Sequence, residues 1–147
     1  LWSDMGAAYD GLHDDMKTRI ADLVAEHDWL TNFGLTMDAA TRDELRKDFP
    51  AAHHPVVRTH PQTGRKTIFV NRAFTQHIVG MEPAESRALL EQLWIQAGFP
   101  EYQCRWRWQP GDVAFWDNRA TQHYASSDYF PNRRVMERIT IIGDRPA

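Results

Sequence analysis

One stretch near the end of the 147-residue chain gathers histidine, tryptophan and arginine side chains. Residues 116–124 include Trp116 and His123, and Arg134 and Arg138 follow within fifteen residues of that histidine. An unpaired charge in a protein core costs several kcal/mol, so an arginine beside short strands must be paired or must hold an anion. This stretch is therefore the strongest candidate for a binding site.

Arg134 and Arg138 are four residues apart in a predicted strand, so their side chains share one face, about 13 Å apart along it. The guanidinium fork suits carboxylate and sulfonate-like oxyanions. The spacing leaves two interpretations open. The pair could bind two separate acidic groups, or it could pair with Glu137 and Asp128 on a solvated face.

His123 could be a metal ligand, an acid–base group or a structural histidine, and a metal site needs at least two further ligands. His13 and Asp15 form a His-x-Asp pair, but they stand among acidic residues where a helix is predicted to begin, which favours a structural role. The remaining candidates are His53, His54 and His60.

No cysteine or carboxylate cluster accompanies those three histidines, and Pro55 and Pro61 follow two of them, so we interpret them as loop residues rather than a zinc site. Cys104 alternates with aromatic residues in a predicted strand, which indicates a buried and inert thiol.

The elements that must position these residues follow from hydrophobic periodicity. Helices are predicted over 16–27, 38–49 and 83–98, the second ended by Pro50 and the third begun by Pro83. Strands are predicted over 56–59 and 67–70, as a hairpin, and over 102–108, 113–116, 135–142 and a short segment around His123.

These elements indicate an α+β fold with five or six strands, without the βαβ alternation or the glycine-rich loop of nucleotide-binding sheets. A closed jelly roll needs eight strands in two sheets, so the chain is two or three strands short. It also begins at Leu1 and not at methionine. We expect residues 1–147 to be a single domain that lacks its N-terminal part.

Composition excludes several classes of partner. Seventeen basic and twenty acidic residues give a net charge of −3, which argues against a nucleic-acid partner. The charges are interspersed and no apolar run approaches about 18 residues, so we expect no membrane partner. A single cysteine is consistent with a reducing compartment and predicts a cytoplasmic location.

Several segments together resemble a known family. Residues 105–112, 116–119, 121–125, 132–134 and 138–146 resemble the C-terminal half of the TauD/TfdA family of Fe(II)- and 2-oxoglutarate-dependent dioxygenases, as do 54–61 and 68–71. The eleven residues from His123 to Arg134 are a spacing specific to this family. The resemblance covers nearly the whole chain and implies a double-stranded β-helix (jelly roll) with helical insertions.

The resemblance also implies roles for single residues. His123 matches the distal histidine of the 2-His-1-carboxylate triad that holds Fe(II). Arg134 matches the arginine that receives the distal carboxylate of 2-oxoglutarate, and Arg138 the arginine that grips the substrate sulfonate. Phe33 and Phe74 match aromatic residues that line the substrate pocket. The family's other two iron ligands, a His-x-Asp pair, would precede Leu1.

The activity implied is hydroxylation, with O₂, of the carbon next to a sulfonate such as taurine, which releases sulfite and an aldehyde together with succinate and CO₂. Alkyl sulfate esters are the alternative substrates, because other members of the family act on them and Arg138 would serve either anion. A non-catalytic, β-rich, anion-binding module is the alternative of a different class. Members of the family form homo-oligomers, which is possible here too.

Overall fold

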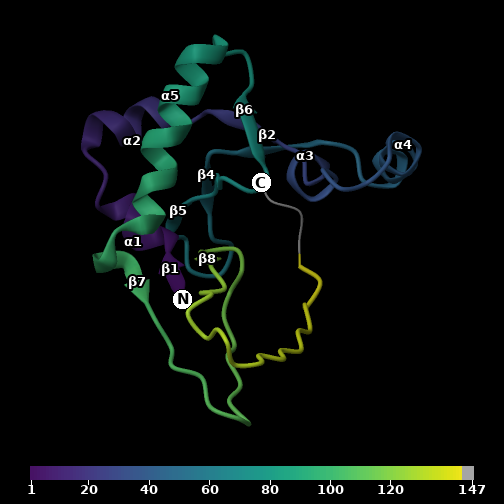
Figure 1. Ribbon diagram of the computed structural model, residues 1–147. Helices are drawn as coiled ribbons and strands as arrows, with labels where there is room; N and C mark the ends of the chain where they lie inside the picture. Colours follow the sequence, from purple (N-terminus) through teal and green to yellow (C-terminus); the bar gives the residue numbers. More distant parts are fainter. Residues whose placement is uncertain (144–147) are drawn as a thin grey trace.

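The computed structural model describes residues 1–143, in which short antiparallel strands and helices are mixed (Figure 1). The described strands form three small sheets. Their orders are β7 (Gln103–Cys104), β1 (Trp2–Asp4) and β8 (Thr121–His123); β3 (Ala52–Pro55), β2 (Val24–His27) and β6 (Thr75–Ile78); and β4 (Val57–Thr59) with β5 (Lys66–Ile68).

The helices lie mostly in the first two thirds of the chain. They are α1 (Met5–Asp10), α2 (Asp14–Ile20), α3 (Leu30–Phe33), α4 (Ala39–Asp48) and α5 (Pro83–Trp94), which continues into the 3₁₀ turns Ile95–Gly98 and Pro100–Tyr102. Asp4 caps α1 because its carboxylate accepts the backbone N–H groups of Gly6 and Ala7. Glu82 caps α5 in the same way, and Pro83 occupies its first turn.

The hydrophobic core lies between α1, α2 and α5 on one side and the central strands on the other (Figure 1). Its fully buried side chains include Met5, Ile20, Ile68, Ile78, Leu89, Leu90 and Leu93. Each such side chain contributes about 1.5–3 kcal/mol by leaving water. The long helix α5 thus holds the sheets in place, whereas α4 buries no residue.

Four of the predicted elements are confirmed. The helix over 38–49 is α4, with Asp38 as its N-cap, and the helix over 83–98 is α5 with its 3₁₀ extension. The hairpin is β4 paired with β5, and the short strand around His123 is β8.

The helix predicted over 16–27 is wrong in its second half. Helix α2 ends at Ile20, and Val24–His27 form β2, the central strand between β3 and β6. Apolar residues four apart suit one face of a helix, but pairing on both edges of β2 satisfies its backbone groups and decides the conformation.

Among the described residues, two predicted strands are absent and a third is much shorter than predicted. Of 102–108 only Gln103–Cys104 is strand, and 113–116 and 135–142 are irregular. Their apolar side chains face solvent: Val113 is 92 % exposed and Ile142 is 96 % exposed. A strand needs a partner for its backbone groups, and residues 1–143 give these segments none. Cys104 is exposed, so its predicted burial is wrong as well.

Within residues 1–143, no helix has the length and apolar character needed to span a bilayer. Residues 144–147 lie outside the described range.

Candidate functional site

A cavity of about 1320 Å³ collects residues from segments that are far apart in the sequence. Four of the five predicted site residues line it, namely Phe33, Phe74, His123 and Arg138. Arg134 is not among the lining residues. The cavity brings the end of α3, the turn before β6, strand β8 and the C-terminal segment to one place.

Strand β8 holds His123 at the cavity wall. In the antiparallel pairing of β1 with β8, His123 lies opposite Trp2, and the N–H of Tyr124 donates to the carbonyl oxygen of Leu1 at 3.0 Å. The Trp116 ring lies 5.2 Å from the imidazole of His123, and the Trp2 ring lies 5.4 Å from that of Trp116. The histidine is therefore held by its strand and flanked by an indole.

Burial lowers the pKa of the His123 imidazole, and the positive charge of Arg138 lowers it further. The neutral imidazole is the form whose nitrogen lone pair can bind a metal ion. The environment of His123 therefore favours the ligating form.

The two arginines of the C-terminal segment are not side by side on a strand, since 135–142 is irregular. Arg138 lines the cavity, whereas the Arg134 guanidinium lies over the Tyr129 ring, 5.6 Å from its centre. Asp128, a proposed partner for either arginine, pairs with Arg105. The structure thus separates the two cations that the sequence placed on one face.

Phe33 and Phe74 form a stacked pair at the cavity, with ring centres 5.5 Å apart and planes inclined by 29°. The turn that carries Phe74 is fixed by Asn71, whose side-chain oxygen accepts the N–H groups of Ala73 and Phe74. The Asn32 amide donates to the carbonyl oxygen of Ala73 at 2.6 Å and so ties this turn to α3. Both rings stay partly exposed and available to a ligand.

Two cavity residues were missed by sequence reasoning, His27 and His54. Their rings meet edge to face with centres 5.1 Å apart, and Phe69 packs against both. Burial, together with the neighbouring His54, lowers the pKa of His27 to about 4, so His27 is neutral near pH 7. Ala52 and His54 are two residues apart in β3, so their side chains lie on the same face of the strand. The assignment of His54 to a loop hid this signal in the sequence.

Of the three histidines assigned to loops, His53 and His54 need correction. His53 and His54 belong to strand β3, because they pair in register with Glu26 and Ala25 of β2. His60 does lie in the turn between β4 and β5, but it is buried. Its partner is Asp117.

Cationic side chains dominate the charge of the cavity wall. Arg72, Arg119 and Arg138 line it, and Asp48 is the carboxylate among its described lining residues. A concave wall that is lined by one sign of charge attracts ligands of the opposite sign. The cavity is therefore suited to an organic anion.

The described histidines that line this cavity are not grouped as a set of metal ligands. Within residues 1–143, no three His, Cys, Asp or Glu side chains are grouped so that they could hold a metal. His13 and Asp15 lie on the surface at the start of α2, where the His13 Nδ1 accepts the Asp15 N–H. Iron could be held here only with further ligands beside His123.

Comparisons with known proteins show what this chain is similar to. Residues 1–140 match the model of the family described as taurine catabolism dioxygenase TauD, TfdA family. An alkylsulfatase of Acinetobacter baylyi is 36 % identical over 97 % of this chain and 47 % of its own length. An alpha-ketoglutarate-dependent sulfate ester dioxygenase of Pseudomonas putida is 35 % identical over 99 % of this chain and 50 % of its own length.

A solved structure is similar too. The crystal structure of a taurine dioxygenase from Burkholderia xenovorans superposes with a TM-score of 0.71 at 36 % identity, covering 88 % of this chain and 41 % of that one. The chain spans about half the length of the curated relatives it matches. Because the family model matches almost the whole length of this chain, the chain belongs to the TauD/TfdA family of dioxygenases.

Proposed function

We propose that the protein carrying this chain is an Fe(II)- and 2-oxoglutarate-dependent dioxygenase that oxidises a small sulfonate or sulfate ester. The observation that carries the proposal is the placement of His123, Arg138 and the Phe33–Phe74 pair around one cavity. A ligating imidazole, an anion-binding guanidinium and an apolar wall are the parts this chemistry needs from the protein.

In this proposal, His123 is one of three iron ligands. The resemblance to the family implies that the other two, a His-x-Asp pair, lie upstream of Leu1. The described residues do not by themselves fit an iron ion. The loaded site would supply oxidation of a substrate C–H bond by O₂, with 2-oxoglutarate converted to succinate and CO₂. The chain's own task is to bind and orient the two organic acids.

Arg138 would bind the sulfonate or sulfate oxygens through paired, charge-assisted hydrogen bonds. The stacked Phe33 and Phe74 would cover the carbon body of the substrate, so that the carbon next to the anionic group faces His123. Arg134 would bind the distal carboxylate of 2-oxoglutarate. That role needs its guanidinium to leave the Tyr129 ring and turn toward the cavity.

The same proposal includes the double-stranded β-helix. Segments 113–116 and 135–142 have β-branched and aromatic residues but no partner strand within residues 1–143, and their apolar side chains are exposed. The chain also spans only about half of its curated relatives. We propose that strands from the rest of the domain pair with these segments and complete the jelly roll.

Sulfonate and sulfate ester are distinguished by their products. Hydroxylation beside a sulfonate such as taurine gives an aldehyde and sulfite, whereas hydroxylation of the carbon that bears a sulfate ester gives an aldehyde and sulfate. The sulfate ester is supported by the names of two relatives, and taurine by the solved structure.

The test is an assay of the full-length protein with Fe(II), 2-oxoglutarate, O₂ and a panel of taurine, longer alkyl sulfonates and alkyl sulfates. We expect substrate-stimulated succinate, matched mole for mole by sulfite or by sulfate. No stimulation by any anion of the panel would contradict the proposal. A full-length protein that binds the anions but no Fe(II) would instead be a non-catalytic anion-binding module.

A further inference from the structure

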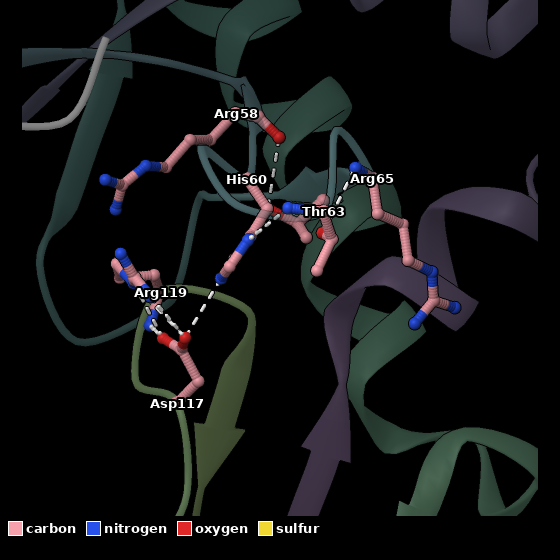
Figure 2. Close-up of polar contacts among 7 residues, drawn as sticks. Arg58, His60, Thr63, Arg65, Asp117 and Arg119 are labelled. Carbon is pink, nitrogen blue, oxygen red and sulfur yellow. Dashed lines mark hydrogen bonds and ion pairs between the residues drawn. The ribbon is translucent and has the colours of Figure 1, made fainter.

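A hydrogen bond between the buried His60 and the more exposed Asp117 joins the hairpin β4–β5 to the turn that precedes β8 (Figure 2). His60, which is only 7 % exposed, lies in the hairpin turn, and its Nε2 is 2.9 Å from the Oδ2 of Asp117. The two residues are 57 positions apart in the sequence. Neither belongs to the metal, co-substrate or substrate contacts proposed above.

The neighbours of His60 decide which of its ring nitrogens carries the proton. Bonds from the Arg119 side chain, foremost, and from His60 hold the pKa of Asp117 well below its usual range, so Asp117 is a carboxylate that only accepts. The Nε2 of His60 must therefore donate to it. On the other side of the ring, the N–H of Thr63 donates to Nδ1 at 3.3 Å. The geometry thus assigns the ring hydrogen to Nε2 and leaves Nδ1 as the acceptor.

Asp117 connects His60 to the cavity wall through Arg119. Its Oδ1 accepts the backbone N–H of Arg119 at 2.9 Å, and its Oδ2 lies 2.7 Å from the Arg119 guanidinium. Arg119 itself lines the cavity. The next residue, Ala120, accepts the N–H of Met5 at 2.9 Å, and β8 with His123 begins immediately after it.

The same hairpin turn also holds the partner strand of β8. The Arg65 guanidinium pairs with Asp4 at 2.9 Å and with Asp10 at 3.1 Å (Figure 2 shows Arg65 turned away from His60). Asp4 is the residue of β1 that lies opposite Thr121 of β8. One short turn, residues 60–65, therefore contacts β1 through Asp4 and the turn before β8 through Asp117.

We propose that His60 is a positioning residue, which acts through Asp117 to fix the register of β8 and thereby the aim of His123 and Arg119 into the cavity. The role of His123 rests on the proposed function, whereas the connection from His60 through Asp117 to β8 does not. Local bonds within 117–120 can form a turn, and the bond from His60 anchors that turn to the hairpin at the end of β4.

Two variants separate the two bonds of the ring. In His60→Gln the side-chain amide can still donate to Asp117, whereas in His60→Asn an oxygen can accept from Thr63 but no donor reaches Asp117. His53→Asn is the matched control, since it makes the same change at an exposed histidine that does not line the cavity.

The first readout is hydrogen exchange in the full-length protein. The N–H groups of Met5 and Tyr124 form bonds between β1 and β8, and that of Val79 bonds to Val24 in a different sheet. We expect His60→Asn to speed exchange at Met5 and Tyr124 about tenfold, since one charge-assisted bond is lost, with little change at Val79. His60→Gln should stay within about threefold of the wild type, and His53→Asn should match it. Equal acceleration at Val79 would mean a general structural role and would overturn the proposal.

The second readout is the affinity of the full-length protein for Co(II), which we expect His60→Asn to weaken about tenfold and His60→Gln to preserve. If the wild type binds no Co(II), the proposed function fails, and hydrogen exchange alone decides the positioning role. If His60→Asn does not fold, ¹⁵N chemical shifts of the wild-type ring decide it. A hydrogen found on Nδ1 would contradict the assignment.

Discussion

Neutral imidazoles beside permanent cations define the cavity at the scale of single residues. Burial lowers the pKa of both His27 and His123, and the guanidinium of Arg138 lines the same cavity. The two kinds of side chain therefore differ in what they can bind. The imidazoles offer lone pairs, and the guanidinium offers hydrogen bonds to an anion.

Replacing Arg138 by alanine should raise the KM for the anionic substrate about 10- to 100-fold, because the variant loses charge-assisted hydrogen bonds to the anion. The KM for 2-oxoglutarate should change by less than about threefold. Steady-state assays of the full-length protein measure both constants. Arg134→Ala is the matched comparison and should show the opposite pattern; equal damage to both constants in either variant would refute the division of roles.

His27 should make the protein sensitive to mild acid. Its pKa of about 4 in the folded state lies below the ordinary 6.5, so the unfolded state binds more protons between these values. Stability is therefore full above pH 6.5 and falls as the pH drops to 4. One pKa unit corresponds to about 1.4 kcal/mol, and the partial exposure of the ring reduces the total to about 1–2 kcal/mol.

Urea unfolding at several pH values between 4 and 7.5 measures this loss. His27→Gln should flatten the dependence in that window, whereas His13→Gln, a change at an exposed histidine, should leave it unaltered. An unchanged slope in His27→Gln would show that other groups cause the acid sensitivity.

Between elements, one side-chain bond ties the long helix to the sheet that bears the cavity histidines. The buried hydroxyl of Ser86 in α5 accepts the backbone N–H of Ile78 in β6 at 2.8 Å. Ser86→Ala leaves that N–H without its acceptor in a place water does not reach. We expect a loss of about 1–3 kcal/mol in the free energy of unfolding, measured by chemical denaturation. Ser127→Ala, at an exposed serine, should cost less than about 0.5 kcal/mol.

Local patterns predicted the elements that are held by local interactions. Helices α4 and α5 carry their own caps and their own apolar or polar faces. The strands of the β4–β5 hairpin are joined by the short turn 60–65. Strand β2 was mistaken for a helix because only its neighbours β3 and β6 make it a strand.

The candidate site follows the same division. His123, Arg138, Phe33 and Phe74 were identified by resemblance, and the cavity brings them together. His27 and His54 were missed because their meeting depends on the register between β2 and β3. The partnership of His60 with Asp117 spans 57 residues and has no local signature in the sequence.

The whole molecule is divided unevenly between packed and open parts (Figure 1). The buried core draws on residues 5–94, whereas much of 105–143 runs as irregular chain around the cavity, with exposed apolar side chains such as Phe115 and Ile139. The exposed segments form the other wall of the site, through Arg119, His123 and Arg138. The packed part of the molecule thus supports the cavity, and the open part supplies most of the residues of the proposed chemistry.

The pairing of β1 with β8 has a consequence for any longer chain. The carbonyl oxygen of Leu1 accepts the N–H of Tyr124, the neighbour of His123, and Leu1 lines the cavity. A residue joined to the amino group of Leu1 would thus be tethered by a single peptide bond to the mouth of the site. Metal ligands in a preceding segment would then be joined to the site by the chain itself. Bringing them to His123 would cost only the entropy of closing the intervening loop.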